Sequence, residues 1–412
     1  MSRLSRSRAR GLGRRPRTDA SAPPPDGVEV AQVSAYYPPA LGGVEVVVAE
    51  LSRAQAQSGC RVRVLTSDVV PAGRPARRHP EDAGLLVHRH RTRVIAHTPV
   101  MPGLLWSLLR LPRRTVVHVH VAHAFVGDVV RLASWVRRTP YVVHFHLDVA
   151  PSGPAGVLLP AYKRWFMGPV LRRAAAVIAL SPGMAHDLVA RFGLPPAKVH
   201  VVGNAVASEY LAQGRERPAA PLQRPLRLLF AGRLAPQKNV TRLLRALELV
   251  SCEVVLRIAG DGELREELER QASHSPHDVL FLGRVDSVGL REQMDWADAF
   301  VMTSEREGMS LVVMEAFASG LPVLATDVPG SDELVRGVGL LVPPDDESVA
   351  GGVERLAADP RLRAELSAAG RAAMRGRDWP GVARAVLQVY ADAGLVADPG
   401  AAAGPTEETP EL

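Results

Sequence analysis

Short apolar runs alternate with amphipathic stretches along most of the chain. The runs are rich in Val, Leu and Ile, which is typical of strands buried on both faces of a parallel sheet. Strands are predicted at 28–35, 61–66, 85–90, 116–123, 141–146, 175–181 and 199–202 in the first half, and at 226–232, 254–260, 279–285, 299–304, 322–326 and 338–342 in the second. Helices are expected between them, among others at 44–58, 163–173 and 240–250. The pattern therefore predicts an α/β fold with two parallel sheets.

A polar, Pro-rich stretch at 213–225 separates the two series of strands and is interpreted as a linker. The length of 412 residues agrees with two domains. The predicted division is a basic, disordered tail at 1–27, a first domain at 28–212, the linker, a second domain at 226–376, a C-terminal helix at 377–395 and a disordered tail at 396–412.

Charge, cysteine content and hydropathy exclude several classes of protein. The net charge is +7, or +6 without the tails, and neither a zinc-finger spacing nor an RNP-like strand is present, so we expect no nucleic-acid partner. The only cysteines, Cys60 and Cys252, lie far apart, which favours a reducing compartment and no zinc site. No apolar run reaches the roughly 18 residues that span a bilayer, and the N-terminus lacks the apolar segment of a secretory signal. We therefore expect a cytoplasmic protein.

Two glutamates frame a helix start in the second half. Glu307 precedes a glycine at a turn, and Glu315 lies inside an apolar run that begins near Met309 or Ser310 and stops at a Gly-x-Pro sequence. Free N–H groups at a helix start suit a phosphate, which makes Gly308, Met309, Ser310 and Leu311 candidate ligand contacts. Eight residues of helix span roughly 12 Å. This spacing favours two carboxylates that bracket an extended ligand over a glycosidase pair, which needs about 5 to 10 Å.

The first strand-to-helix turn of each half carries a second signal. Gly42 and Gly43 let the backbone approach a ligand closely. In the second half, Gly232 and Arg233 follow the first strand, and Lys238 comes five residues after the arginine. Two cations in a loop that ends at a helix can converge on one diphosphate.

Five histidines gather near the ends of two neighbouring predicted strands: His118, His120, His123, His144 and His146. Clustered histidines can bind a metal ion, but no carboxylate accompanies them at close spacing, so we expect none. A dinucleotide-dependent oxidoreductase is also disfavoured. The G-x-G at 260–262 lacks its third glycine, and the chain has no Walker A motif.

The motifs of the second half closely resemble those of the retaining family 4 glycosyltransferases, which have the GT-B fold of two Rossmann-like domains facing a central cleft. The resemblance rests on the E-x7-E pair, on A-x-A-x-G-x-P-V-x-x-x-D at 316–327 and on G-R-x4-K at 232–238. It implies that Glu307 binds the donor sugar hydroxyls and Glu315 the nucleotide ribose. Arg233 and Lys238 then hold the diphosphate and are catalytic with Glu307.

The resemblance extends with less specificity to the first half and covers about residues 28–390. His146, in VVHFH, matches the active-site histidine that contacts donor sugar and acceptor, and His120 matches a histidine of the preceding strand. Gly42 and Gly43 are placed beside the donor diphosphate, and Arg284 at the strand end that reads the nucleobase. Asp148 is a candidate partner for an acceptor amine. Two turns depart from the family pattern: Ala205 replaces a glycine, and 329–333 reads PGSDE in place of G-G-x-P-E.

Together these residues imply a retaining transfer from a UDP- or GDP-linked sugar to an acceptor hydroxyl, without metal ion or cofactor. The acceptor classes considered are a small natural product of the aminoglycoside type, a cell-envelope glycan and a lipid. Basic and aromatic residues at 106–114 and 163–173 are typical of interfacial helices and add an expectation of peripheral contact with the inner face of the membrane. The alternatives are a nucleotide-sugar epimerase on the same fold and a nucleotide-sugar-binding protein without turnover.

Overall fold

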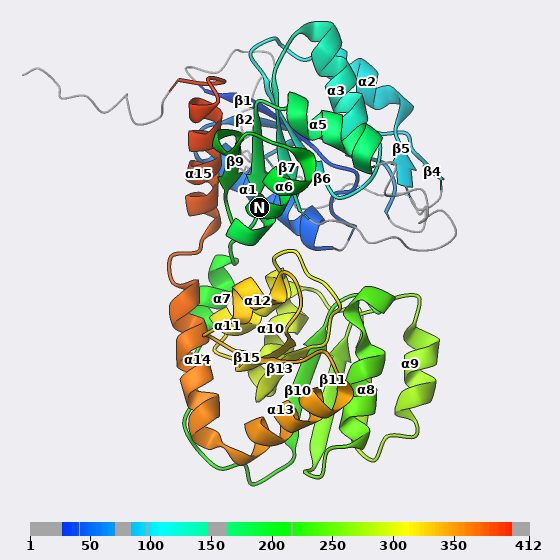
Figure 1. Cartoon of the computed structure of the whole chain (residues 1–412), viewed down its shortest axis with the longest axis vertical. Coiled ribbons are helices and arrows are strands. Elements are labelled where there is room, and N and C mark those ends of the chain that lie inside the picture. The colour runs from blue at the N-terminus through cyan, green and yellow to red at the C-terminus, as the bar shows by residue number, and fades with distance from the viewer. Residues whose placement is uncertain are drawn as a thin grey trace, which may run out of the picture.

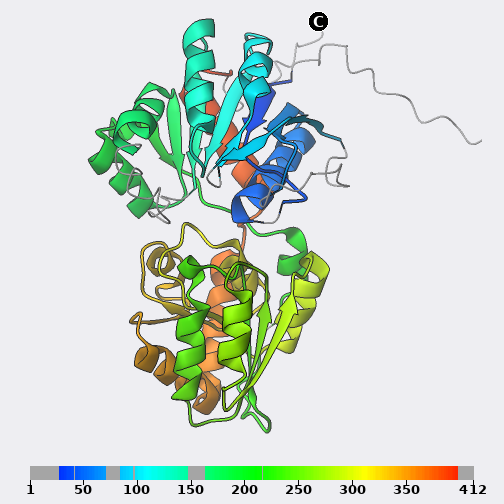
Figure 2. The same cartoon turned by 90° about the vertical axis from the view of Figure 1, so that its right-hand side faces the viewer.

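The chain folds into two lobes, each built on a parallel sheet, as Figures 1 and 2 show for the computed structural model. The structure describes residues 27–40, 42–70, 84–95, 98–146, 163–215 and 217–397. In the first lobe the strand order is β3-β2-β1-β6-β7-β8-β9. The bounds are β1 Glu29–Val33, β2 Arg61–Ser67, β3 Leu86–His90, β6 Val116–Val121, β7 Tyr141–Phe145, β8 Ala176–Ala179 and β9 Val199–Val201.

The second lobe has strand order β12-β11-β10-β13-β14-β15, again parallel throughout. The bounds are β10 Leu226–Ala231, β11 Val254–Ala259, β12 Asp278–Gly283, β13 Ala299–Met302, β14 Val323–Thr326 and β15 Leu340–Val342. Every strand of the two large sheets coincides with one of the strands expected from the sequence. The expected α/β fold with two Rossmann-like parallel sheets is thus confirmed.

Helices cover both faces of each sheet. In the first lobe they are α1 Gly43–Gln57, α2 Pro102–Leu109, α3 Val126–Arg137, the π-helix η3 Lys163–Met167, α5 Gly168–Arg173, α6 Pro182–Phe192 and η4 Pro196–Lys198. Helix α7 Ser208–Gln213 packs against the core of the second lobe through Tyr210 and lies beside α11 in Figure 1. In the second they are η5 Pro236–Lys238, α8 Val240–Glu248, α9 Arg265–Ala272, α10 Ser287–Trp296, α11 Leu311–Ala318, α12 Ser331–Val335, α13 Asp346–Ala358 and α14 Pro360–Met374. The final helix is α15 Trp379–Asp392.

Side-chain alternation along the strands of the first lobe decides what each face meets. Val117, Val119 and Val143 join a core with α2, α3 and α5 on one face. Val116 and Val142 join a core with α1 and α15 on the other. Figure 1 shows α15 alongside the first lobe, although it follows α14 of the second. Two helices from opposite ends of the chain therefore share one face of the first sheet.

One element of the first lobe was not expected from the sequence, and one expected helix begins irregularly. A short antiparallel hairpin joins β4 Arg93–Ile95 to β5 Thr98–Val100. The stretch predicted as one helix at 163–173 begins as the π-helix η3 and continues as α5, with Pro169 in the first turn of α5. Proline has no backbone N–H, so the regular ladder starts anew at this point.

Hydrogen bonds between distant residues hold the lobes in place. The Asn204 side chain, in the loop after β9, donates from Nδ2 to the carbonyl of Met309 at 3.0 Å. The backbone N–H of Val206 donates to the carbonyl of Arg377 at 3.0 Å, just before α15 begins. The loop that leads into α11 therefore contacts the end of the first lobe.

Candidate active site

The two charged residues of the second lobe meet at the carboxyl ends of neighbouring strands. Lys238 ends η5 after β10, Glu307 follows β13, and β10 pairs directly with β13. The Lys238 Nζ lies 2.6 Å from Glu307 Oε1, and the Ser304 hydroxyl donates to the same oxygen. Both side chains are largely buried. Residues 69 positions apart thus form one ion pair, which is stronger than a surface pair because it is shielded from water.

A glycine turn fixes the backbone of Glu307. The Glu307 N–H donates to the Pro329 carbonyl at 3.0 Å, and Gly330 packs against the Glu307 carbonyl. Gly330 has φ +88°, and a Cβ there would lie 2.1 Å from that oxygen. Only glycine fits such a position without moving Glu307. Sequence reasoning noted the departure of this turn from the family pattern but did not find that it supports Glu307.

Arg233 follows Gly232 after β10 and faces the first lobe. Its positive charge opposes the effect of burial on Glu45, whose pKa burial raises, and it adds to burial in lowering the pKa of His123 to about 4. Glu45 lies in the first turn of α1, behind the Gly42–Gly43 turn. The Arg233 loop and this turn are therefore electrostatic neighbours across the lobes.

The Gly42–Gly43 turn leaves space for the Glu45 carboxylate. A Cβ at Gly42 would lie 2.2 Å from Glu45 Oε2, whereas one at Gly43 would meet nothing within 4 Å. Glu45 and His123, which packs edge-on against Tyr36 with ring centroids 5.1 Å apart, were not among the predicted site residues. The available signals were the acidic residue just after paired glycines and a histidine shortly after a strand.

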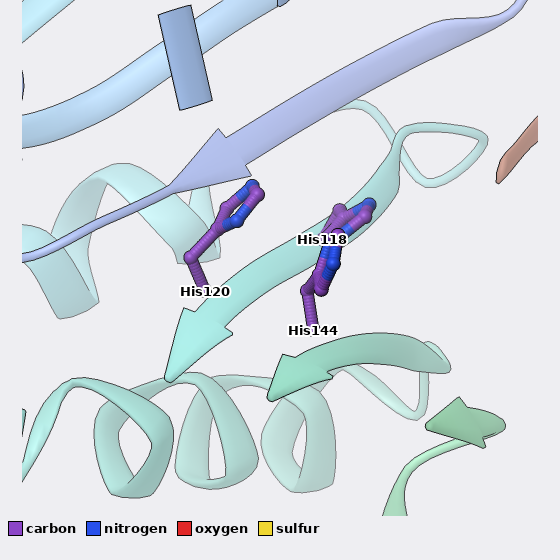
Figure 3. Close-up of side chains that lie close together, drawn as sticks. All are labelled: His118, His120 and His144. Atoms are coloured by element: carbon purple, nitrogen blue, oxygen red, sulfur yellow. The ribbon is translucent and has the colours of Figure 1, made fainter. Parts of the chain in front are cut away.

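The histidines of β6 and β7 form a buried stack on the face that meets α1 and α15. Rings of His120 and His146 lie 5.1 Å apart, and those of His144 and His146 lie 4.4 Å apart, in near-parallel planes. Figure 3 shows His118 and His120 on one strand and His144 on the next. Burial, reinforced by the neighbouring imidazoles, lowers the pKa of His118 and of His120, and burial alone lowers that of His146 to about 3. The stack is therefore neutral at pH 7.

A continuous chain of hydrogen bonds connects this stack to both helices. His146 Nε2 lies 2.8 Å from His120 Nδ1, and His120 Nε2 lies 2.7 Å from Gln32 Oε1. Gln32 donates to Gln55 of α1 at 2.7 Å, and Gln55 donates to the Tyr390 hydroxyl at 3.2 Å. That hydroxyl lies 2.6 Å from Nδ1 of His118. Of the clustered histidines, the sequence motifs assigned a site role only to His120 and His146, and nothing in the sequence pointed to the two glutamines or the tyrosine.

The geometry of the stack does not favour a metal ion. One nitrogen from each of His118, His120 and His144 lies within 4.8 Å of the others. However, the ring planes of His118 and His120 differ by 9°, and those of His120 and His144 by 26°. An imidazole lone pair lies in its ring plane, so the lone pairs of stacked rings run side by side and do not converge on one point. Both nitrogens of His120 are also hydrogen bonded already.

Glu315 lies in a different environment from Glu307. It occupies α11, where burial and the negative charge of Glu50 on α1 raise its pKa to about 7. Just ahead of it, Leu311 packs against the core shared by α1 and α15, and Met309 accepts the hydrogen bond from Asn204. The helix start predicted at Met309 or Ser310 is observed at Leu311, with Ser310 as its N-cap.

Of the other predicted site residues, Arg284 follows β12 and pairs with Asp261 at 3.3 Å on the surface. Gly308 lies in the turn against Gly330. Asp148 lies outside the described residues. The structure thus brings Lys238 and Glu307 into contact, and His120 and His146 into contact. Within the described residues no hydrogen bond or ion pair joins the histidine pair to the charged pair.

Comparison with known proteins covers both lobes. The family model of the glycosyl transferase 4-like domain matches residues 42–205, and that of glycosyl transferases group 1 matches residues 225–359. The D-inositol 3-phosphate glycosyltransferase of Xylanimonas cellulosilytica is 30% identical, over 89% of this chain and 97% of that protein. The GDP-mannose-dependent alpha-mannosyltransferase of Mycobacterium tuberculosis is also 30% identical, over 88% and 96%.

Solved structures show the same fold. The Anabaena protein HepE in complex with UDP superimposes with a TM-score of 0.68 at 18% identity, over 88% of this chain and all of that one. WaaG, a glycosyltransferase involved in lipopolysaccharide biosynthesis, gives a TM-score of 0.63 at 16% identity, over 87% and 99%. Together with the family models and the curated relatives, these findings show that the chain belongs to the family 4 glycosyltransferases with the GT-B fold.

Proposed function

We propose that this glycosyltransferase moves a sugar from a nucleotide-sugar donor to an acceptor hydroxyl with retention of anomeric configuration and without a metal ion or cofactor. The observation that carries the proposal is the buried Lys238–Glu307 pair, which lies in loops after β10 and β13 beside the Arg233 loop. Such a site offers two cations to a diphosphate and one carboxylate to sugar hydroxyls.

Each residue has a distinct task in the proposed reaction. As the bond between the anomeric carbon and the phosphate oxygen breaks, its electron pair moves to the phosphate, and Arg233 and Lys238 stabilise the charge that develops there. Glu307 accepts hydrogen bonds from the donor sugar. The departing phosphate takes the proton of the acceptor hydroxyl, whose oxygen attacks from the same face. Donor binding exchanges the Lys238–Glu307 contact for contacts of each residue with the donor.

Retention is proposed because no sequence motif supplies a carboxylate base for the opposite face of the sugar. An inverting path needs such a base in line with the leaving group. Proton NMR of the product tests this: an α-linked donor should give an α-linked product, read from the anomeric coupling. A β-linkage would overturn the mechanism.

Metal independence is proposed because Arg233 and Lys238 supply the positive charge that a metal ion would provide. The chain also contains no Asp-x-Asp sequence, a common arrangement of metal-binding carboxylates. Excess EDTA should leave the transfer rate unchanged. A large loss that magnesium or manganese restores would refute this part.

For the donor we propose a UDP- or GDP-linked sugar. HepE was crystallised with UDP, and one relative is named as GDP-mannose-dependent. Among acceptors, relatives named for D-inositol 3-phosphate and phosphatidyl-myo-inositol support a polyol or a lipid. A small aminoglycoside-type acceptor, for which Asp148 is the candidate amine partner, and a cell-envelope glycan stay within the proposal.

Panels of UDP- and GDP-sugars, each with candidate acceptors, test the function directly. Transfer should release the nucleoside diphosphate in proportion to glycosylated product. A changed sugar on an intact nucleotide would instead identify an epimerase, and saturable binding without turnover would identify a binding protein. Either result would overturn the proposal.

A further inference from the structure

Three neighbouring helices of the first lobe expose an unusual number of large apolar side chains. Helix α3 packs against α2, α5 and η3. Figure 1 shows α2, α3 and α5 together in the first lobe. Trp106 on α2, Trp135 on α3 and Trp165 on η3 are 61%, 63% and 69% exposed. Leu132, Val136 and Phe166 are also exposed. These six residues are called the aromatic face below.

The sequence of α3 shows how this face arises. Val126, Val130 and Ala133 point to the core, as the inward side of an amphipathic helix does. Trp135 and Val136 lie three and four residues after Leu132, so these three side chains form a second apolar stripe on the outer side of the helix. Large exposed apolar side chains gathered on three packed helices are typical of an interaction surface.

The net positive charge of the chain is concentrated in the same part of the sequence. Residues 101–200 contain twelve Lys and Arg against three Asp and Glu, a net +9, whereas the whole chain has +7. Exposed arginines of this region are Arg110, Arg113, Arg114, Arg138, Arg172, Arg173 and Arg191. The Arg110 guanidinium lies over the Trp106 ring, 4.4 Å from its centroid. Arginine and tryptophan side by side suit the headgroup layer of a bilayer, where one binds phosphate and the other rests at the apolar boundary.

We propose that the aromatic face docks on an anionic lipid surface. The inference deepens the proposed function, because docking would bring the site to a membrane-borne acceptor. A second copy of the chain fits less well, since symmetric pairing would place two strongly positive surfaces against each other. A nucleic acid offers matching charge but nothing to receive the aliphatic stripe of Leu132 and Val136.

Co-sedimentation with vesicles tests the proposal without donor or acceptor, so it is independent of catalysis. Wild-type protein should bind phosphatidylcholine vesicles that contain ~30% phosphatidylglycerol, a typical anionic fraction. It should bind vesicles of pure phosphatidylcholine at least tenfold more weakly. Replacing Trp106, Trp135 and Trp165 by Ser should weaken binding at least tenfold. Changing Arg110, Arg113 and Arg114 to Gln should weaken vesicle binding about fivefold per arginine. It should also make the remaining binding less sensitive to salt, because fewer charges are left for salt to screen.

A matched control replaces three exposed apolar residues of the second lobe, Leu249, Leu280 and Val288, by Ser. This variant should bind vesicles as the wild type does. Equal loss of vesicle binding in the tryptophan variant and in this control would overturn the proposal. Equal binding of the wild type to neutral and anionic vesicles would also overturn it. A third contrary outcome concerns oligomeric state. If light scattering shows a wild-type dimer that the tryptophan variant does not form, and neither protein binds vesicles, the face is a dimer interface.

A separate observation, the hydrogen-bond chain behind His146, carries a second inference. We propose that Gln32, fully buried on β1, is a positioning residue that sets which nitrogen of His146 carries the proton. Its Oε1 accepts the Nε2 proton of His120, which leaves His120 Nδ1 to accept from His146 Nε2. His146 Nδ1 then carries no proton and can accept a hydrogen bond. The inference rests on the proposed role of His146 at the sugar.

Two substitutions at Gln32 separate positioning from folding. Glu at this position keeps an oxygen for His120, whereas Met has a similar size and offers no comparable acceptor. Gln32→Met should lower kcat at least tenfold with little change in donor KM. Gln32→Glu keeps the acceptor for His120 and should retain most of the kcat, although loss of the donor to Gln55 lowers its thermal stability. Nitrogen-15 NMR of the histidine side chains reads the tautomer directly, without any substrate. An unchanged His146 tautomer in Gln32→Met would refute the inference even if transfer is confirmed.

Discussion

The two lobes place different polar groups near the carboxyl ends of their strands. The second lobe places a charged pair, Lys238 and Glu307, in loops at strand ends, with Arg233 nearby. The first lobe places neutral imidazoles on its strands, held by Gln32 and by helices from both ends of the chain. A diphosphate needs fixed positive charge, whereas a sugar and its acceptor need oriented hydrogen bonds near the bond that changes. The division of polar chemistry between the lobes matches the division of the proposed substrate.

Removing either member of the charged pair should have the largest effect. Lys238→Ala and Glu307→Ala should each reduce transfer by at least ~100-fold, since each loses a charge-assisted contact with the donor worth about 3 kcal/mol. Arg245→Ala, which breaks the exposed ion pair with Asp346, is the control and should behave as wild type. Steady-state kinetics at saturating donor decides the matter, and near-normal turnover in either site variant would remove these residues from the site.

Moving the charged pair without removing it should cost less. Gly330→Ala places a methyl group against the Glu307 carbonyl, so we expect a loss of roughly ten- to 100-fold in kcat, the scale of a misplaced catalytic group. Gly337→Ala is a matched control, because its φ of +81° carries similar backbone strain but a Cβ there meets nothing within 4 Å. Equal activity of the two variants would show that the turn does not position Glu307.

The two lobes also differ in how far their sites follow from sequence. The charged residues of the second lobe occupy short local motifs at predicted strand ends, and neighbouring strands of a parallel sheet bring such ends together. The alternation in VVHVH and VVHFH likewise places the histidines on one face of the first sheet. The partners of those histidines could not be found this way. Gln55 and Tyr390 are 335 residues apart, and their meeting depends on α15 crossing back to the first lobe.

The neutral stack should make the first lobe sensitive to acid. Burial lowers the pKa of His118 and His146 to about 3, against about 6.5 in the unfolded chain. The unfolded state therefore binds more protons below pH 6.5, and the free energy of unfolding should fall by about 1.4 kcal/mol per imidazole for each pH unit below it. Denaturant unfolding at pH 7 and pH 5 measures this slope.

His144→Leu should flatten that slope, because burial also lowers the pKa of His144 and the substitution removes one titrating imidazole from the stack. Neither nitrogen of His144 has a hydrogen-bond partner among the described residues, so an apolar side chain replaces it without breaking a bond. His274→Leu, an exposed position of the second lobe, is the control and should leave the slope unchanged. An identical slope in the wild type and in His144→Leu would show that protonation of the stack does not cause the pH dependence of the free energy of unfolding.

The smallest expected effect belongs to Glu315, the one predicted donor contact whose charge depends on pH near neutrality. Burial and the charge of Glu50 raise the pKa of Glu315 from 4.5 to about 7. Between pH 4.5 and pH 7, Glu315 is therefore protonated in the folded protein and ionised in the unfolded chain. Its contribution to stability is therefore present below pH 4.5 and is lost as the pH rises through 7.

A ribose hydroxyl binds a carboxylate more tightly than a carboxylic acid, so the donor KM should fall a few-fold between pH 6 and pH 8. Glu315→Gln should abolish this change, and Glu50→Gln should move it to lower pH because one of the two causes of the raised pKa is removed. A donor KM that stays pH-dependent in Glu315→Gln would assign the titration to another group.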